Sequence, residues 1–200
     1  MQQTSKKREK FESTRAKLLA TARAAFAAEG YAGSATDALV ARAGLTRGAL
    51  YYQFRDKRDL FRAVLVAAQR EIAAEIERAA LAAPEPWAAL LAGCKTFIAT
   101  SARPDLRRIV LIDGPAVLGW DEWRRIDAEH GTALLLAGLE ACARAGYLRD
   151  VPLVPLNHLL AGALNEAALV LAERPDDADA CRAMAVAIER LLGGLRRPRA

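Results

Sequence analysis

The chain has 200 residues, of which 53% are hydrophobic and 26% charged, a balance typical of a soluble globular protein with enough apolar material for a core. Its three cysteines, Cys94, Cys142 and Cys181, are widely spaced and odd in number, and they give neither a disulfide framework nor a metal-ligand spacing. The N-terminal MQQTSKKREK contains no apolar segment of the kind found in secretory signals, and polar residues interrupt the longest apolar stretch. We therefore expect a cytoplasmic protein with no membrane span.

The net charge of +5 is distributed unevenly along the chain. Residues 1–62 hold 13 Lys and Arg against 6 Asp and Glu, whereas residues 63–200 hold 16 against 18. A basic excess confined to one part of a chain is the electrostatic footprint expected of a phosphate-binding surface. The alternative is an ordinary solvated charged face.

The first 60 residues predict three short helices. A basic arm, residues 1–12, is expected to be disordered or loosely helical, and apolar residues at helical spacing indicate a helix over 14–29 that ends at Gly30. A second helix is expected over 35–43, with Ser34 or Ala35 near its N-cap, and Gly44 ends it.

Thr46 is expected to cap a third helix over 47–54, because its hydroxyl can accept from an unpaired backbone N–H. Two helices separated by a short turn that contains Gly form a helix-turn-helix, which places its second helix in a DNA major groove. The small core of this unit is expected to contain Leu39, Leu45, Leu50 and Phe54.

The rest of the chain predicts a larger helical body. Asp56 has the character of an N-cap, and few helix breakers follow until Pro84, which predicts a connecting helix of roughly 25 residues and on the order of 40 Å. Further helices are expected over 86–101, 104–113, 119–145, 155–173 and 177–192, with Pro and Gly at the joints. Because no strand-like alternation appears, the fold class is all-α.

The segment TRAKLLATARAAFAAEGY, followed by SATDALVARAGLTRGALYYQFRDKRDL over residues 34–60, resembles the N-terminal domain of the TetR family of bacterial transcriptional repressors. The matching features include the Gly30-Tyr31 corner, the Ala-Gly-Leu-Thr turn, the Tyr-Tyr-x-Phe run and Lys57 before Leu60. The resemblance covers about 50 residues. It implies about nine helices, arranged as a DNA-binding head over 1–56 and an effector-binding and dimerisation body over 57–200.

The residue chemistry of the third helix agrees with DNA contact. Arg47 can bridge two guanine acceptors, Gly48 adds no bulk, and Tyr51 and Tyr52 offer flat faces and hydroxyls. Ala35 stands where Thr or Ser often holds a phosphate in the family, so we expect Ser34 or Thr36 to supply that contact. The expected DNA-binding residues are Ser34, Thr36, Thr46, Arg47, Gly48, Tyr51, Tyr52, Gln53 and Lys57.

The resemblance also implies two partners besides a palindromic DNA operator. One is a second copy of the chain, bound through the helices expected over 155–173 and 177–192; the alternative is that their apolar stripes are intrachain core. The other is a small-molecule effector held among the helices over 86–173. The residues expected to touch it are Phe97, Asp113, Trp120, Trp123, His130 and Asn165.

These features predict a ligand-responsive repressor of transcription. An alternative is a redox-responsive regulator that uses one of its cysteines. A small helical enzyme is a further alternative, but no catalytic or phosphate-binding motif is present, so we expect no enzyme, no catalytic residue, no metal and no cofactor.

Overall fold

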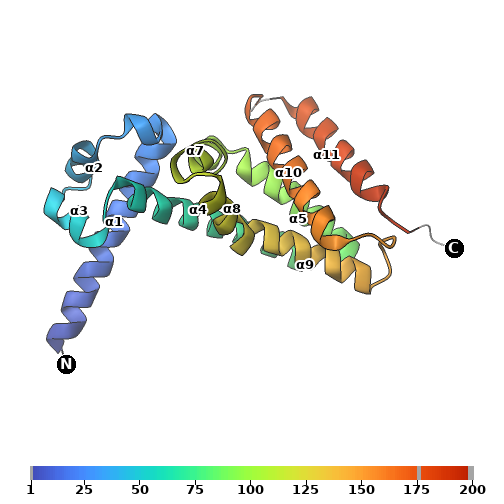
Figure 1. Ribbon diagram of the computed structural model, residues 1–200, viewed down its shortest axis with the longest axis horizontal. Helices are drawn as coiled ribbons and strands as arrows, with labels where there is room; N and C mark the ends of the chain where they lie inside the picture. The colour runs from blue at the N-terminus through green and yellow to red at the C-terminus, as the bar shows by residue number, and fades with distance from the viewer. Residues whose placement is uncertain (1, 175–176, 198–200) are drawn as a thin grey trace.

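The computed structural model describes residues 2–174 and 177–197. Met1 of the expected arm and residues 198–200 of the expected body lie outside this range. Within the described part, the regular structure is helical apart from one isolated antiparallel bridge between Leu148 and Arg196. The all-α expectation is therefore confirmed, and the chain forms an N-terminal group of three helices and a larger helical body (Figure 1).

Helix α1 (Gln2–Gly33) begins twelve residues before the expected start. The basic arm continues the helix because its polar side chains pair one turn apart, as Ser5 with Glu9 and Arg8 with Glu12. Gly30 interrupts the helix, as expected, with a φ of 76° that residues with a side chain rarely adopt.

Helices α2 (Thr36–Arg42) and α3 (Arg47–Gln53) are joined by the expected glycine turn. Gly44 has a φ of 63°, and the backbone N–H of Leu45 donates to the carbonyl of Val40 at 2.9 Å. Thr46 caps α3 as expected, because its hydroxyl oxygen accepts from the backbone N–H of Ala49 at 3.2 Å. Of the expected head core, Leu39, Leu50 and Phe54 are buried and Leu45 is half-buried.

Helix α4 (Lys57–Leu81) begins at the expected cap. The Asp56 carboxylate accepts from the backbone N–H of Asp59 at 2.7 Å. Leu60 and Phe61 are buried near its first turn and Ile72 and Ile76 near its end, so the helix belongs to the cores of both the head and the body. Figure 1 shows α4 running from the three-helix head beneath the helices of the body.

The body follows the expected order with three differences in detail. The helix expected over 104–113 is a short α-helix followed by a π-helical segment, and an additional short helix follows it. The helix expected over 119–145 is divided at His130, where φ is −126° and ψ is −87°. The elements are α5 (Pro86–Ser101), α6 (Pro104–Arg107), η1 (Arg108–Asp113), α7 (Gly114–Leu118), α8 (Trp120–Glu129), α9 (Gly131–Arg144), α10 (Leu153–Ala172) and α11 (Ala178–Gly193).

Side-chain hydrogen bonds stabilise two of these three features. The Trp123 indole N–H donates to the carbonyl of Val110 inside η1 at 2.7 Å, which satisfies a backbone group in the π-helical turn. At the division between α8 and α9, the Thr132 hydroxyl donates to the Asp127 carboxylate across the break.

Helix α10 is the one described helix whose length and mean hydropathy would suffice to cross a membrane. It packs against α5, α9 and α11, and 33% of its most apolar 18-residue window is buried within the chain. Buried Asn157 near its start also fits a core helix better than a membrane-spanning one.

Candidate DNA interface and ligand cavity

One face of α3 presents most of the expected DNA-contacting residues to solvent. Thr46, Arg47, Gly48, Tyr51 and Tyr52 are all exposed, and Tyr52 is 70% exposed although it is aromatic. The buried Leu50 anchors the opposite face of α3 against the head core. The local fold therefore turns a contiguous polar and aromatic surface outward.

Arg47 is held at the N-terminal end of this surface. Its guanidinium lies 3.2 Å from a carboxylate oxygen of Asp37 and 5.8 Å from the ring centre of Tyr51. Both side chains of the ion pair are mostly exposed, so the pair costs little to open. Arg47 is thus oriented along α3 and free to exchange Asp37 for a base or a phosphate.

Ser34 and Gln53 use their side chains inside the protein instead. Ser34 is buried, and its hydroxyl donates to the carbonyl of Gly30 at 2.8 Å. The Gln53 side-chain amide donates to the carbonyl of Phe11 at 3.0 Å, which ties α3 to α1. Thr36, at the first position of α2, is half-buried and is the member of the Ser34/Thr36 pair nearer to solvent.

Lys57 is half-buried, and its ammonium group closes the corner between α1 and α2. It donates to the carbonyl of Tyr31 at 2.9 Å and to the carbonyl of Ser34 at 3.0 Å, and it lies 4.1 Å from the ring centre of Tyr31. The structure therefore gives Lys57 a positioning role in the head, in addition to any contact with a phosphate.

Arginine and aspartate side chains join the head to the body. Arg108 of η1 donates to the carbonyls of Ala28 and Glu29 at the end of α1, at 3.1 and 3.3 Å. Asp113, at the other end of η1, accepts from the backbone N–H of Tyr31 at 2.8 Å. The π-helical segment is thus fastened to the head at both of its ends.

A second connection runs through α8. Glu122 accepts from Arg58 at 2.7 Å and from Arg62 at 2.9 Å, both in the first two turns of α4. Partial burial alone would raise the pKa of Glu122, but the two guanidinium groups hold that pKa below its ordinary value. Glu122 is therefore a stable anionic partner for the end of α4 that adjoins the head.

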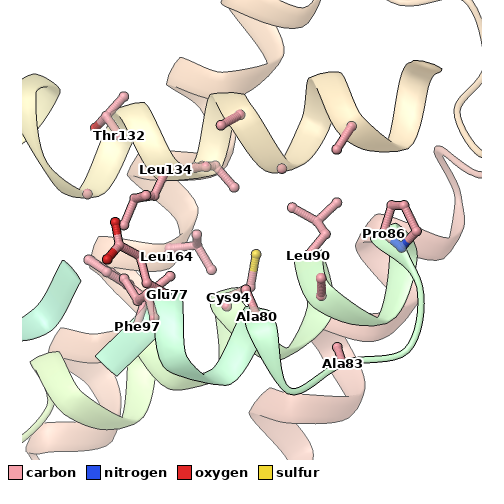
Figure 2. Close-up of a pocket in the computed structure, with 18 of the residues that line it drawn as sticks. Glu77, Ala80, Ala83, Pro86, Leu90, Cys94, Phe97, Thr132, Leu134 and Leu164 are labelled. Atoms are coloured by element: carbon pink, nitrogen blue, oxygen red, sulfur yellow. The ribbon is translucent and has the colours of Figure 1, made fainter. Parts of the chain in front are cut away.

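The body contains a cavity of about 670 Å³ between α4, α5, α9 and α10. Figure 2 shows Leu90, Cys94, Leu134 and Leu164 directed into it. A cavity of this size and apolar character suits a drug-sized molecule. Small residues on the facing helices and in the connection between α4 and α5 create the space, among them Ala80, Ala83, Ala89, Gly93, Ala137, Gly138, Ala141 and Ala161.

One end of the cavity is polar. Asp127, buried at the end of α8, accepts the Thr132 hydroxyl, and the Gln69 side-chain amide lies 3.5 Å from its other oxygen. Burial raises the pKa of Asp127, and the lowering effects of Thr132 and of the Arg124 charge only partly offset this. Among the described residues, no group of His, Cys, Asp and Glu is arranged to hold a metal ion.

Comparison with known proteins bears on both parts of the chain. The family model described as bacterial regulatory proteins, tetR family, matches residues 18–64, and that described as the tetracyclin repressor-like C-terminal domain matches residues 87–195. A TetR-family transcriptional regulator from Pectobacterium atrosepticum is 34% identical, with 96% of this chain and 99% of that one covered and a TM-score of 0.79. The chain belongs to the TetR family.

Two more distant solved structures share the fold. The fatty acid degradation regulator of Bacillus halodurans is 16% identical, with 89% and 93% of the two chains covered and a TM-score of 0.75. The ketosteroid transcriptional regulator of Mycobacterium tuberculosis is 17% identical, with 92% and 95% covered and a TM-score of 0.61. No match is found among curated protein sequences. The protein is thus a TetR-family transcriptional regulator with a helix-turn-helix head.

The residues expected to touch an effector fall into two groups in this TetR-family body. Phe97 and Asn165 line the cavity, whereas Asp113, Trp120, Trp123 and His130 do not. Asp113 is used at the head, Trp120 is 61% exposed, and buried Trp123 donates to Val110. His130 occupies the break between α8 and α9, next to lining residue Gly131.

Sequence reasoning missed the acidic groups of the cavity, Glu77, Glu85 and Asp127. Asp127 could have been suspected because it lies one turn after the apolar Trp123, on the inner face of an otherwise charged helix. Glu77 gives no such signal, since its neighbours on α4 are a mixture of charged and small residues.

Helices α10 and α11 carry several exposed apolar side chains. TetR-family regulators act as dimers. Exposed apolar side chains gathered on neighbouring helices are typical of a surface that contacts another protein. On α10 and α11 they are Val154, Leu159, Val170, Val186 and Leu191.

The cysteines differ in their surroundings. Burial raises the pKa of the Cys94 thiol to about 12 and that of the Cys142 thiol to about 11, so both are protonated near neutral pH. The Cys142 thiol also lies 3.3 Å from the carbonyl of Pro86. Cys181 is exposed on α11. Two of the three thiols are therefore poor nucleophiles.

Proposed function

We propose that the protein is a homodimeric, ligand-responsive repressor that occupies a palindromic DNA operator and releases it when a small molecule enters the cavity. The observation that carries this proposal is the physical connection between the cavity and the head through α4 and α8. A regulator of bacterial DNA acts in the cytoplasm, where a diffusible metabolite or toxin can reach it.

The head contacts DNA through the exposed surface of α3. Arg47 reads base edges near the N-terminal end of the helix, Gly48 allows close approach, and Tyr51 and Tyr52 contact thymine methyls or phosphates. Thr46 and Thr36 add phosphate contacts, and Lys57 supports the corner beside them. Ser34 and Gln53 position the helices rather than touch DNA, because the Ser34 hydroxyl and the Gln53 side-chain N–H already donate to backbone carbonyls inside the head.

Dimerisation places two such heads on one operator. The exposed apolar residues of α10 and α11 are the surface we assign to the partner copy, in agreement with the helices expected from the sequence. A twofold dimer presents its reading helices to half-sites about one helical turn apart, which accounts for a palindromic operator.

Helix α8 supplies a route from the cavity to the head. Asp127 lies at the cavity and Glu122, five residues earlier on the same helix, holds Arg58 and Arg62. Five helical residues span roughly 7.5 Å, so a displacement of α8 by a ligand is transmitted within one rigid element. A ligand that binds better to one orientation of α8 therefore shifts the population of head positions.

The decisive experiment selects bound DNA from random oligonucleotides and then titrates small molecules into the labelled complex. A molecule that releases the wild-type protein should fail to release Ala141→Phe, because the larger side chain fills the cavity while the head is unchanged. Ala133→Phe is a matched control, since Ala133 is exposed on the same helix outside the cavity lining. If the Ala141→Phe protein left the DNA at the ligand concentration that releases the wild-type protein, the proposed effector site would be contradicted.

A further inference from the structure

Charge in the cavity is of one sign. The carboxylic acid residues in its described lining are Glu77, Glu85 and Asp127, and this lining includes no Lys, Arg or His. Glu85 already accepts a hydrogen bond from the Tyr147 hydroxyl at 2.5 Å. Exposed Glu77 and buried Asp127 remain as the carboxylates without a cationic ion-pair partner among the lining residues.

These two carboxylates are accompanied by an unused acceptor. Gln69 adjoins the cavity beside lining residue Asp127 and is not itself part of the lining. It is 1% exposed, and its side-chain oxygen has no hydrogen-bond partner in the described structure. A methyl group built on lining residue Gly131 would lie 3.5 Å from an Asp127 oxygen and 3.9 Å from the Gln69 oxygen. The Asp127 oxygen and the unpaired Gln69 oxygen therefore face the same narrow space, and burying the Gln69 oxygen without a donor is costly.

An aromatic ring completes this end of the cavity. The Phe97 ring lies 3.9 Å from the same built position on Gly131. Figure 2 shows Phe97, Glu77 and Thr132 at one end of the cavity and Ala83 and Pro86 at the other. Acceptor oxygens beside an aromatic ring form an environment that favours a cation carrying N–H groups.

We propose that the cavity takes an amphiphilic cation, an amine with an apolar body, whose N–H groups meet Asp127, Gln69 and Glu77. The apolar body lies along Leu90, Cys94 and Leu164 toward the far end. A carboxylate of the same shape would be repelled by the acidic groups and would find no lining cation. This inference deepens the proposed function, since it rests on the cavity being the effector site.

The test compares three probes that share one apolar body: octylamine, octanol and octanoate. Isothermal titration calorimetry on the full chain should rank octylamine first and octanoate last, with about a tenfold difference between octylamine and octanol. The double variant Glu77→Gln, Asp127→Asn should lose about tenfold in octylamine affinity. Its octanol affinity should stay unchanged, which shows that the fold and the apolar part of the cavity are intact.

Glu140→Gln provides the matched control. It removes one carboxylate from an exposed position of α9 outside the cavity lining, and octylamine should bind it as it binds the wild type. Equal binding of octanoate and octylamine, binding of none of the three probes, or an undiminished amine preference in the double variant would each overturn the inference.

Operator release, measured separately with the labelled complex, distinguishes the two proposals. If octylamine binds selectively but does not release DNA, the proposed function is contradicted and the proposed ligand class still holds. If octanoate binds more tightly than octylamine and releases DNA, the proposed ligand class is contradicted and the proposed function still holds.

Discussion

The guanidinium group of Arg108 occupies the space into which a side chain at Gly30 would project. A Cβ atom at Gly30 would lie 2.6 Å from Nη2 and 2.9 Å from Nε of Arg108. Gly30 also has φ 76° and ψ 170°, a conformation that is essentially restricted to glycine. The corner at the end of α1 therefore depends on glycine for its own backbone and for the contact of η1 with the head.

Gly30→Ala should lower the free energy of unfolding by about 2 kcal/mol, because backbone strain and displacement of Arg108 act together. Urea denaturation at fixed protein concentration measures the change. Adding Arg108→Ala to this variant should recover only the part of the lost stability that comes from the clash with Arg108, since the backbone strain at position 30 remains. A Gly30→Ala protein that unfolds at the wild-type urea concentration would show that the corner tolerates a side chain.

Gly48→Ala should have the opposite effect on stability and a separate effect on DNA binding. The space around Gly48 is open, with only the Thr46 hydroxyl oxygen at 3.9 Å, so alanine in this helix should stabilise the free protein by up to about 1 kcal/mol. On DNA the added methyl group should obstruct close approach and weaken operator binding about tenfold, equal to about 1.4 kcal/mol. Unchanged affinity in a fluorescence anisotropy titration would remove Gly48 from the interface.

Arg47→Ala should weaken operator binding by about 1–3 kcal/mol and relax the base preference at one position of each half-site. Selection from random oligonucleotides measures that preference. Arg55→Ala is the control: Arg55 is also an exposed arginine, but it follows α3 and lies 3.7 Å from Asp59. Arg47→Ala should change the selected sequence, whereas Arg55→Ala should select the same sequence as the wild type.

The local signals in the sequence predicted the parts of the fold that local interactions determine. Thr46 and Asp56 cap their helices where expected because an N-cap side chain bonds to backbone within three residues. Helix α5 matches its expected bounds, Pro86–Ser101, because proline begins it. The division at His130 was missed, since it depends on Asp127 and Thr132 bonding across the break and no proline or strong breaker marks it.

The candidate site could likewise be predicted from the sequence only where local periodicity determines it. The exposed residues of α3 follow from helix periodicity, but the internal use of Gln53 depends on Phe11, 42 residues away. For the cavity, large aromatic residues were expected as lining, and Trp123 instead fills core space beside Gly114. The cavity exists where facing helices carry Ala and Gly, a property of tertiary packing that periodicity does not reveal.

Acid should destabilise the fold through Glu71. The hydrogen bond from Arg23 lowers the pKa of Glu71, and burial opposes this only in part. The ordinary pKa of this carboxyl is 4.5, and its pKa in the folded state is lower. Such a group stabilises the folded state at a pH above 4.5, and this stabilisation is lost as the pH falls through the folded pKa. Urea midpoints between pH 6 and pH 3 should therefore fall steeply below about pH 4.5. They should fall less steeply in Glu71→Gln, whereas Glu140→Gln, with its exposed carboxylate on α9, should follow the wild type.

Asp127→Asn should stabilise the protein at neutral pH, the reverse of the usual effect of removing a hydrogen-bonded carboxylate. Burial raises the pKa of Asp127, so the folded state binds more protons than the unfolded state between the ordinary value of 3.8 and the folded pKa. Stability from this group is therefore greatest below 3.8 and declines as the pH rises through the folded pKa. Asparagine keeps an oxygen that can accept the Thr132 hydroxyl but carries no charge to bury. Urea denaturation at pH 4 and pH 8 should show a larger gain for Asp127→Asn at pH 8, and a loss of stability at pH 8 would mean that the Asp127 charge is already compensated in the folded protein.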